Sequence, residues 1–318
     1  MTRRSGVTWA PTSVPEIRRR WCDALDGMIE RHSAGLITQP GTARPADGVR
    51  LRRLQDQLAT TIEVMKAESQ ALRDAEMYWV ARDMVDVARD AATTLPEWTP
   101  DIAAPCRNGL LCWAKPAGTV PYGPTATATA AVPWDGVWWW TRPDGRLQVS
   151  PASRFANRAE LLEPYGVSTP LWAAHTIVVD PSRPRTEEAN GTEDMHPFVS
   201  IVGAAWLLMG QPGVTETRSI RDRPMPGPPF GARPSLASST SPAVTIVELR
   251  RPVRGPQDDA PSQESARSFS RRWWVGGHWR QQACGPHLGQ RRPTWIAPHV
   301  KGPPGTPLTT DKVYLWRR

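Results

Sequence analysis

Hydrophobic positions in the first third of the chain recur at helical spacing. Residues 14–33 carry apolar side chains three or four positions apart, which predicts an amphipathic helix. A longer stretch of the same kind predicts a second helix over residues 48–75, and residues 78–95 predict a third. Basic and acidic side chains alternate between the apolar positions, as on the solvated face of a helix. We therefore expect a helical N-terminal region.

Between residues 100 and 147 the pattern changes to short apolar runs broken by glycine and proline, which is typical of strands. The run GVWWWTRPDGRLQV predicts a hairpin, because Pro143, Asp144 and Gly145 supply turn residues between two β-prone runs. We expect a small sheet here, and we expect the three tryptophans at 138–140 to pack on a buried helix over residues 196–210.

Residues 211–242 are rich in proline, glycine and serine, the composition of a linker. Beyond them, four β-prone runs predict the strands of a second small sheet: residues 243–251, 271–279, 294–297 and 312–316. The expected fold class is α+β, with a helix-rich α+β domain over 1–210, a linker over 211–242 and a small β-rich domain over 243–318.

Charge is distributed unevenly along this chain of 318 residues. The formal net charge is +8, but residues 267–318 hold ten Lys or Arg and one acid, a net charge of +9, so that residues 1–266 sum to −1. A basic end of this kind favours a polyanionic partner such as DNA or RNA.

Cations and aromatic rings alternate within residues 271–302, as they do in single-stranded nucleic-acid sites, where cations hold phosphates and rings stack on bases. Our first hypothesis is a nucleic-acid-binding protein that uses this segment. The candidate binding residues are Arg271, Arg272, Trp279, Arg280, Gln282, Arg291, Arg292 and Lys301.

Two alternatives remain open. In the first, His278, Arg280 and His299 converge in an RNA-cleaving, toxin-like enzyme, with one histidine taking a proton, the other supplying one and the arginine stabilising the transition state. In the second, the basic end docks on a protein partner and contacts no nucleic acid. Against the first hypothesis, alternate tryptophans on short strands most often form a core, and arginines of the basic end could pair with acids of the N-terminal region.

The sequence predicts neither a metal nor a cofactor. The four cysteines form no CxxC pair, and the gaps between His278, Cys284, His287 and His299 match no standard zinc pattern. The signatures of P-loop, dinucleotide, serine-hydrolase and zinc-protease sites are missing. The scattered cysteines favour a reducing, cytoplasmic setting. The longest apolar stretch, residues 198–209, is too short to span a membrane, and no apolar signal segment follows the basic N-terminus.

The run VGGHWRQQACGPHLGQRRPTWIAPHVKGPPGTPL, followed by KVYLWRR, resembles the ending of a group of uncharacterised actinobacterial proteins associated with phages and mobile elements. The resemblance extends upstream through AEMYWVARDM, AAWLLMGQP and VTIVELRR. It implies a protein of a phage or mobile element or of its bacterial host, and it implies no catalytic role. Cys284 stands where the group more often has an aromatic residue, which argues against a required thiol.

Overall fold

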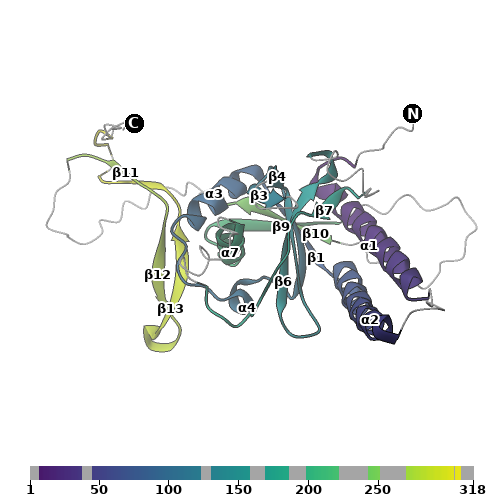
Figure 1. Ribbon diagram of the computed structural model, residues 1–318. Helices are drawn as coiled ribbons and strands as arrows, with labels where there is room; N and C mark the ends of the chain where they lie inside the picture. The colour runs from purple at the N-terminus through teal and green to yellow at the C-terminus, as the bar shows by residue number, and fades with distance from the viewer. Residues whose placement is uncertain are drawn as a thin grey trace, which may run out of the picture.

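The computed structural model describes residues 7–37, 45–122, 130–157, 169–185, 198–221, 243–250, 270–303 and 305–308. The chain has an α+β fold (Figure 1). Its helices are α1 (Val14–Ile37), α2 (Pro45–Arg73), α3 (Arg82–Ala92), α4 (Pro100–Ala103) and α7 (Phe198–Met209), with 3-10 turns η1 (Pro11–Ser13), η2 (Phe155–Asn157) and η4 (Pro286–Leu288).

The strands follow in chain order. They are β1 (Glu76–Val80), β2 (Asn108–Trp113), β3 (Gly118–Tyr122), β4 (Ala130–Trp134), β5 (Gly136–Thr141), β6 (Leu147–Arg154), β7 (Leu171–Ala173), β8 (Ile177–Val179), β9 (Thr215–Arg221), β10 (Ala243–Leu249), β11 (Trp273–Val275), β12 (His278–Cys284), β13 (Gln290–Ile296) and β14 (His299–Lys301).

One mixed sheet organises the body of the protein. Its strand order is β7-β6-β5-β2-β1-β10-β9, with β8 pairing β6 beside β7. Strand β1 runs parallel to both of its neighbours, β2 and β10, and the remaining pairs are antiparallel. The predicted hairpin over GVWWWTRPDGRLQV is confirmed as β5 and β6, with Gly145 in a left-handed conformation in the turn.

The prediction of one helix over residues 78–95 is wrong at its start. Residues 76–80 form β1, and the helix α3 begins only at Arg82. Four consecutive β1 residues, Met77 to Val80, are buried, because both faces of a strand in the middle of the sheet are covered. A continuous apolar run of this kind fits a buried strand as well as it fits a helix.

Side chains alternate between two hydrophobic clusters, one on each face of the sheet. In β5, Trp138 and Trp140 pack with α1 and α2, whereas Trp139 points to the opposite face and packs against Trp206 of α7 with a ring-centroid distance of 5.1 Å. Only the middle tryptophan of the triplet therefore packs on the helix for which all three were predicted. Period-two alternation in a strand is the reason.

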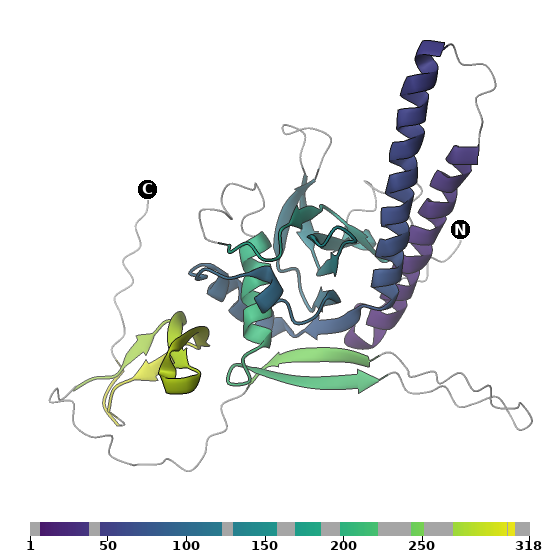
Figure 2. The same cartoon turned by 90° about the horizontal axis from the view of Figure 1, so that it is seen from below.

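The predicted helices over residues 14–33 and 48–75 are confirmed as α1 and α2. They cover one face of the sheet through residues such as Ile17, Trp21 and Leu72. Both helices extend past the sheet as an antiparallel pair (Figure 2).

Helices α3 and α7 cover the other face (Figure 1). The prediction of a buried helix near residues 196–210 is confirmed by α7, in which ten of twelve residues are buried. No helix in the described ranges is both long and apolar enough to cross a membrane.

The chain does not divide where the sequence suggested. Strand β10, expected in a separate C-terminal sheet, pairs with β1 in the main sheet, and Val244, Ile246 and Val247 are buried there. Strand β9 lies within the expected linker and is the edge strand beside β10. The rest of that segment, 222–242, and the predicted strand at 312–316 lie outside the described residues.

Candidate nucleic-acid interface

Residues 273–301 form a long antiparallel hairpin, which we call the C-terminal ribbon. It stands on the α3 and α7 side of the sheet, at the end of the molecule opposite the α1–α2 pair (Figures 1 and 2). Strand β12 pairs with β13 from His278↔Ile296 to Cys284↔Gln290, and β11 pairs with β14 from Trp273↔Lys301 to Val275↔His299. The two pairings share one register, so they are two arms of a single ribbon.

The ribbon is interrupted where Gly276 and Gly277 face Ala297 and Pro298. Gly277 is required there, because a Cβ atom at this position would lie 2.3 Å from Cζ2 of the Trp295 ring. At Gly276 a Cβ atom would meet nothing within 4 Å. The glycine at 277 therefore lets the backbone pass directly over the indole of Trp295.

One face of the ribbon docks on the body of the protein. Trp279 and Trp295 lie opposite each other across β12 and β13, with ring centroids 5.4 Å apart and an interplanar angle of 63°. Trp295 is buried in the same hydrophobic cluster as α3 and α7, and Trp279 packs against that cluster. We call this side of the ribbon the docking face.

Hydrogen bonds fix the docked position. The indole N–H of Trp279 donates to the carbonyl oxygen of Ala91 in α3 at 2.8 Å. The backbone N–H of Trp295 donates to Oε1 of Gln211 at 2.8 Å, and the guanidinium of Arg292 donates to the carbonyl oxygen of Gly210 at 3.0 Å. These contacts tie the ribbon to the ends of α3 and α7.

The opposite side, which we call the outer face, carries the other half of the alternating side chains. In register order it presents the following residues: Trp274 opposite Val300, His278 opposite Ile296, Arg280 opposite Thr294, Gln282 opposite Arg292, and Cys284 opposite Gln290. Leu308, bridged to Arg272, belongs to the same face.

Four of these residues form a compact group of hydrogen-bond donors. Arg280 faces Thr294, Gln282 faces Arg292, and Arg280 and Arg292 are diagonal neighbours, which places their Cα atoms about 7–8 Å apart. We call Arg280, Gln282, Arg292 and Thr294 the donor quartet. The guanidinium of Arg280 and the amide of Gln282 are exposed and can bind phosphate and base-edge oxygens, whereas the guanidinium of Arg292 already donates to Gly210.

Charge on the ribbon is of one sign. Residues 270–308 contain six Lys or Arg and no Asp or Glu. Four of these cations are exposed, and their side chains make neither a hydrogen bond nor an ion pair within the described part of the chain: Arg271, Arg280, Arg291 and Lys301. In the body, Arg19, Arg154 and Arg218 each pair with a carboxylate, whereas the side chains of Arg82, Arg89 and Arg107 are exposed and have no partner among the described residues.

Two of the predicted binding residues, Arg272 and Trp279, support the structure of the ribbon. Arg272 donates through Nε to the carbonyl oxygen of Thr306 at 2.7 Å, which holds residues 305–308 beside the ribbon. Trp279, for which we expected contact with bases, is half-buried on the docking face. Arg280, Gln282, Arg291, Arg292 and Lys301 remain exposed.

The three residues of the enzyme hypothesis are not assembled into one group. The shared register assigns His278 and Arg280 to the outer face and His299, opposite Val275, to the docking face. Each histidine pairs its Nδ1 with a carbonyl oxygen two residues earlier, at 3.0 Å: Gly276 for His278 and Ala297 for His299. No group of three or more His, Cys, Asp or Glu within the described residues could hold a metal ion.

Two residues of the outer face, Trp274 and Thr294, were not among the candidate binding residues chosen from the sequence. Trp274 was counted among the tryptophans expected on the ribbon, but nothing in its spacing distinguishes it from Trp273 and Trp279. The pairing register provides the distinction, because it places Trp274 on the outer face with the donor quartet.

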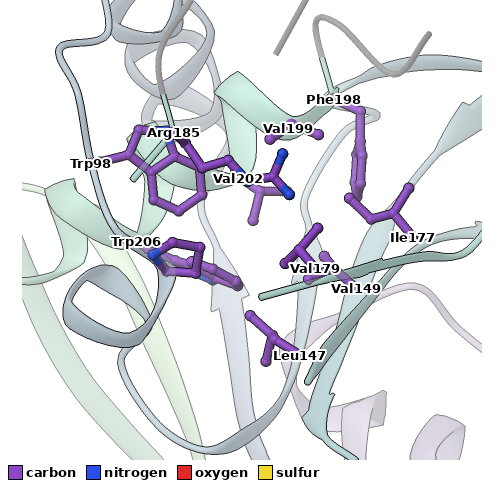
Figure 3. Close-up of a pocket in the computed structure, with 11 residues that line it drawn as sticks. Trp98, Leu147, Val149, Ile177, Val179, Arg185, Phe198, Val199, Val202 and Trp206 are labelled. Carbon is purple, nitrogen blue, oxygen red and sulfur yellow. The ribbon is translucent and has the colours of Figure 1, made fainter. Parts of the chain in front are cut away.

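A cavity between α7 and the β6–β8 edge is lined by Trp98, Val179, Phe198 and Trp206 and holds about 10 Å³, which is room for about one water molecule (Figure 3). The buried side chain of Arg185 points into the same region. This cavity is a packing feature and is too small for a substrate.

A larger depression of about 400 Å³ lies beside α4 and is lined by Cys106, Arg107 and Thr141. Burial raises the pKa of the Cys106 thiol to about 11, so the thiol stays protonated at neutral pH and is a poor nucleophile.

The carboxyl group of Asp135 is buried and accepts hydrogen bonds from Arg154 and Asn157 at 3.0 Å and 2.6 Å. Its pKa is raised, because burial disfavours the charged form. These two hydrogen bonds satisfy the carboxyl group within the fold, and they join the β4–β5 corner to the end of β6. Asp135 therefore has a structural explanation.

No family model, curated protein or solved structure matches this chain.

Proposed function

We propose that the protein binds nucleic acid through the C-terminal ribbon. One observation carries the proposal: residues 270–308, which hold the ribbon, contain six cations and no acids, and the side chains of four exposed cations among them make no hydrogen bond or ion pair within the described residues. Unpaired cations on a surface attract a polyanion, because they neutralise its phosphates and release the counterions condensed on the nucleic acid.

The shape of the ribbon supports the same proposal. It is a two-stranded element whose docking face lies on the body, while Arg280, Gln282 and the distal turn over residues 285–289 are exposed. The docking tryptophans stabilise this presentation, which makes the ribbon a rigid support for the donor quartet.

We extend the proposal to a nucleic-acid-binding protein of a phage or mobile element or of its bacterial host, on the resemblance of the C-terminal segment alone. All four cysteines are free thiols, which fits a reducing compartment such as the cytoplasm. We do not propose cleavage of RNA, because the register separates His278 from His299. A protein partner remains the outcome to be expected if nucleic acid does not bind.

Binding of a fluorescent oligonucleotide to the full chain tests the proposal by anisotropy. Replacing Arg280 and Arg291 with glutamine removes two unpaired cations from the ribbon. The matched control replaces Arg19 and Arg218, which pair with Glu16 and Glu248, and so changes the net charge equally.

We expect the ribbon variant to bind more weakly than wild type and the control to bind as wild type does. Equal binding by all three proteins would contradict the assignment of the site to the ribbon. An absence of binding at low salt would contradict the function itself.

A further inference from the structure

Trp274 is an exception among the tryptophans of this protein. Of the fifteen within the described residues, eleven are buried, three are half-buried and only Trp274 is exposed. Its exposure is 57%. Buried tryptophans are explained by the core, since a large apolar ring is stabilised by leaving water. Trp274 needs a different explanation.

The surroundings of Trp274 form an apolar platform on the outer face. Val300 lies directly opposite Trp274 and is 44% exposed. Leu308 is bridged to Arg272, two residues before Trp274, and is 47% exposed. The hydrogen bond from Arg272 to Thr306 holds the segment that carries Leu308. The exposed ring is thus presented by two strands and an attached segment.

Unpaired cations flank this platform. Arg271 lies three residues before Trp274 and Lys301 follows Val300; both are exposed, and Lys301, opposite Trp273, belongs to the other face of the strand pair. The donor quartet lies farther along the same face. Arg280 is six residues from Trp274, which is about 20 Å along an extended strand. An exposed apolar ring with unpaired cations near it and farther along the ribbon matches a nucleic-acid strand with a base on the ring and its phosphates along the ribbon.

Resting on the proposed function, we infer that the ribbon binds single-stranded nucleic acid, with a base stacked on Trp274 and phosphates held by exposed, unpaired cations such as Arg280. The exposed indole of Trp274 favours binding of a single strand over binding of a duplex. In a duplex each base is already stacked between its neighbours, so an exposed indole finds no free base face without unstacking one. In a single strand every base offers a face.

A duplex would use the ribbon differently. A two-stranded ribbon fits the major groove, and the donor quartet could read base edges there. That arrangement needs Arg280 and Gln282 but gives Trp274 no partner. The effect of a Trp274 substitution therefore separates the two modes of binding.

The test compares the wild-type full chain with Trp274→Ala and Trp274→Phe. Each protein is titrated against fluorescent oligo-dT, oligo-U and a DNA duplex of the same length. Trp274→Ala should weaken single-strand binding by about 5-fold to about 150-fold, and Trp274→Phe should restore part of the loss. Oligo-dT and oligo-U distinguish DNA from RNA as the source of the single strand.

Ile102→Ala is the matched control, since Ile102 is 81% exposed on the body and far from the ribbon in sequence. It should bind as wild type does. Because Trp274 is exposed, its variants should also unfold at the wild-type temperature, which confirms that they are folded.

Tighter binding of the duplex, or single-strand binding that Trp274→Ala leaves unchanged, would overturn this inference while the proposed function stands. Failure of all three probes to bind at low salt would overturn the inference together with the proposed function.

Discussion

Trp295 lies opposite Trp279 across the C-terminal ribbon, and the pair joins the ribbon to the hydrophobic cluster beneath α3 and α7. From the sequence we expected these rings to stack on bases, but they hold the basic segment to the body of the protein. The side chains of the outer face are therefore positioned by the tryptophans of the docking face.

Replacing Trp295 with alanine should destabilise the folded protein by about 3–5 kcal/mol, because Trp295 is buried with 2% exposure and its removal leaves a cavity. Denaturant unfolding measures the loss, and hydrogen exchange should show faster exchange in β12 and β13. Trp274→Ala is the control and should change stability by less than about 0.5 kcal/mol. A Trp295→Ala protein as stable as wild type would show that the docked arrangement is incorrect.

Gly277→Ala should also undock the ribbon, because the new methyl group would lie 2.3 Å from the Trp295 ring. Overpacking of this kind costs about 1–3 kcal/mol. Gly276→Ala, one residue earlier, meets open space and should be nearly neutral. Thermal unfolding of the two variants checks the prediction, and similar melting temperatures for both would argue against the close approach of backbone and indole.

Much of the fold could be predicted because its periodicities are strong. The helical spacing over residues 14–33 and the turn residues after the tryptophan triplet depend on local geometry, and both predictions are confirmed. The strand β1 was missed, since a run that is buried on both faces shows neither a period of two nor a period of 3.6. Strand β10 was recognised as a strand but assigned to the wrong sheet, because pairing with β1 is a long-range contact that leaves no local signal.

The sequence indicates which segment carries the candidate site, but not which of its side chains face away from the body. The cations of residues 271–302 and the absence of acids there are properties of composition, which the sequence states directly. Which tryptophans face the body depends on where α3 and α7 present an apolar surface. That choice is made by tertiary packing, so Trp279 and Trp274 could not be separated beforehand.

Glu68 of α2 predicts a pH dependence of stability. Burial against the sheet raises its pKa, although Trp138 and Gln148 donate hydrogen bonds to its carboxylate and Arg142 lies near it, which act in the opposite direction. The folded protein therefore holds a proton at Glu68 more tightly than the unfolded chain does. The contribution of Glu68 to the free energy of unfolding falls as the pH rises through the raised pKa.

Glu68→Gln removes this titration and keeps an acceptor oxygen for both donors. Relative to wild type, the variant should gain stability as the pH rises from acidic values to neutrality. Urea unfolding across this range measures the difference. A difference between Glu68→Gln and wild type that does not vary with pH, or that falls as pH rises, would be inconsistent with a raised pKa.

The salt dependence of oligonucleotide binding tests the central claim most directly. For the full chain, a plot of log affinity against log salt should be a falling straight line. Replacing Arg280 and Arg291 with glutamine should make the slope shallower by about 1.4 for a single strand or about 1.8 for a duplex, as expected when two phosphate contacts are lost. The Arg19 and Arg218 control should keep the wild-type slope. Binding that does not vary with salt, or a slope that the ribbon variant shares with wild type, would contradict the account.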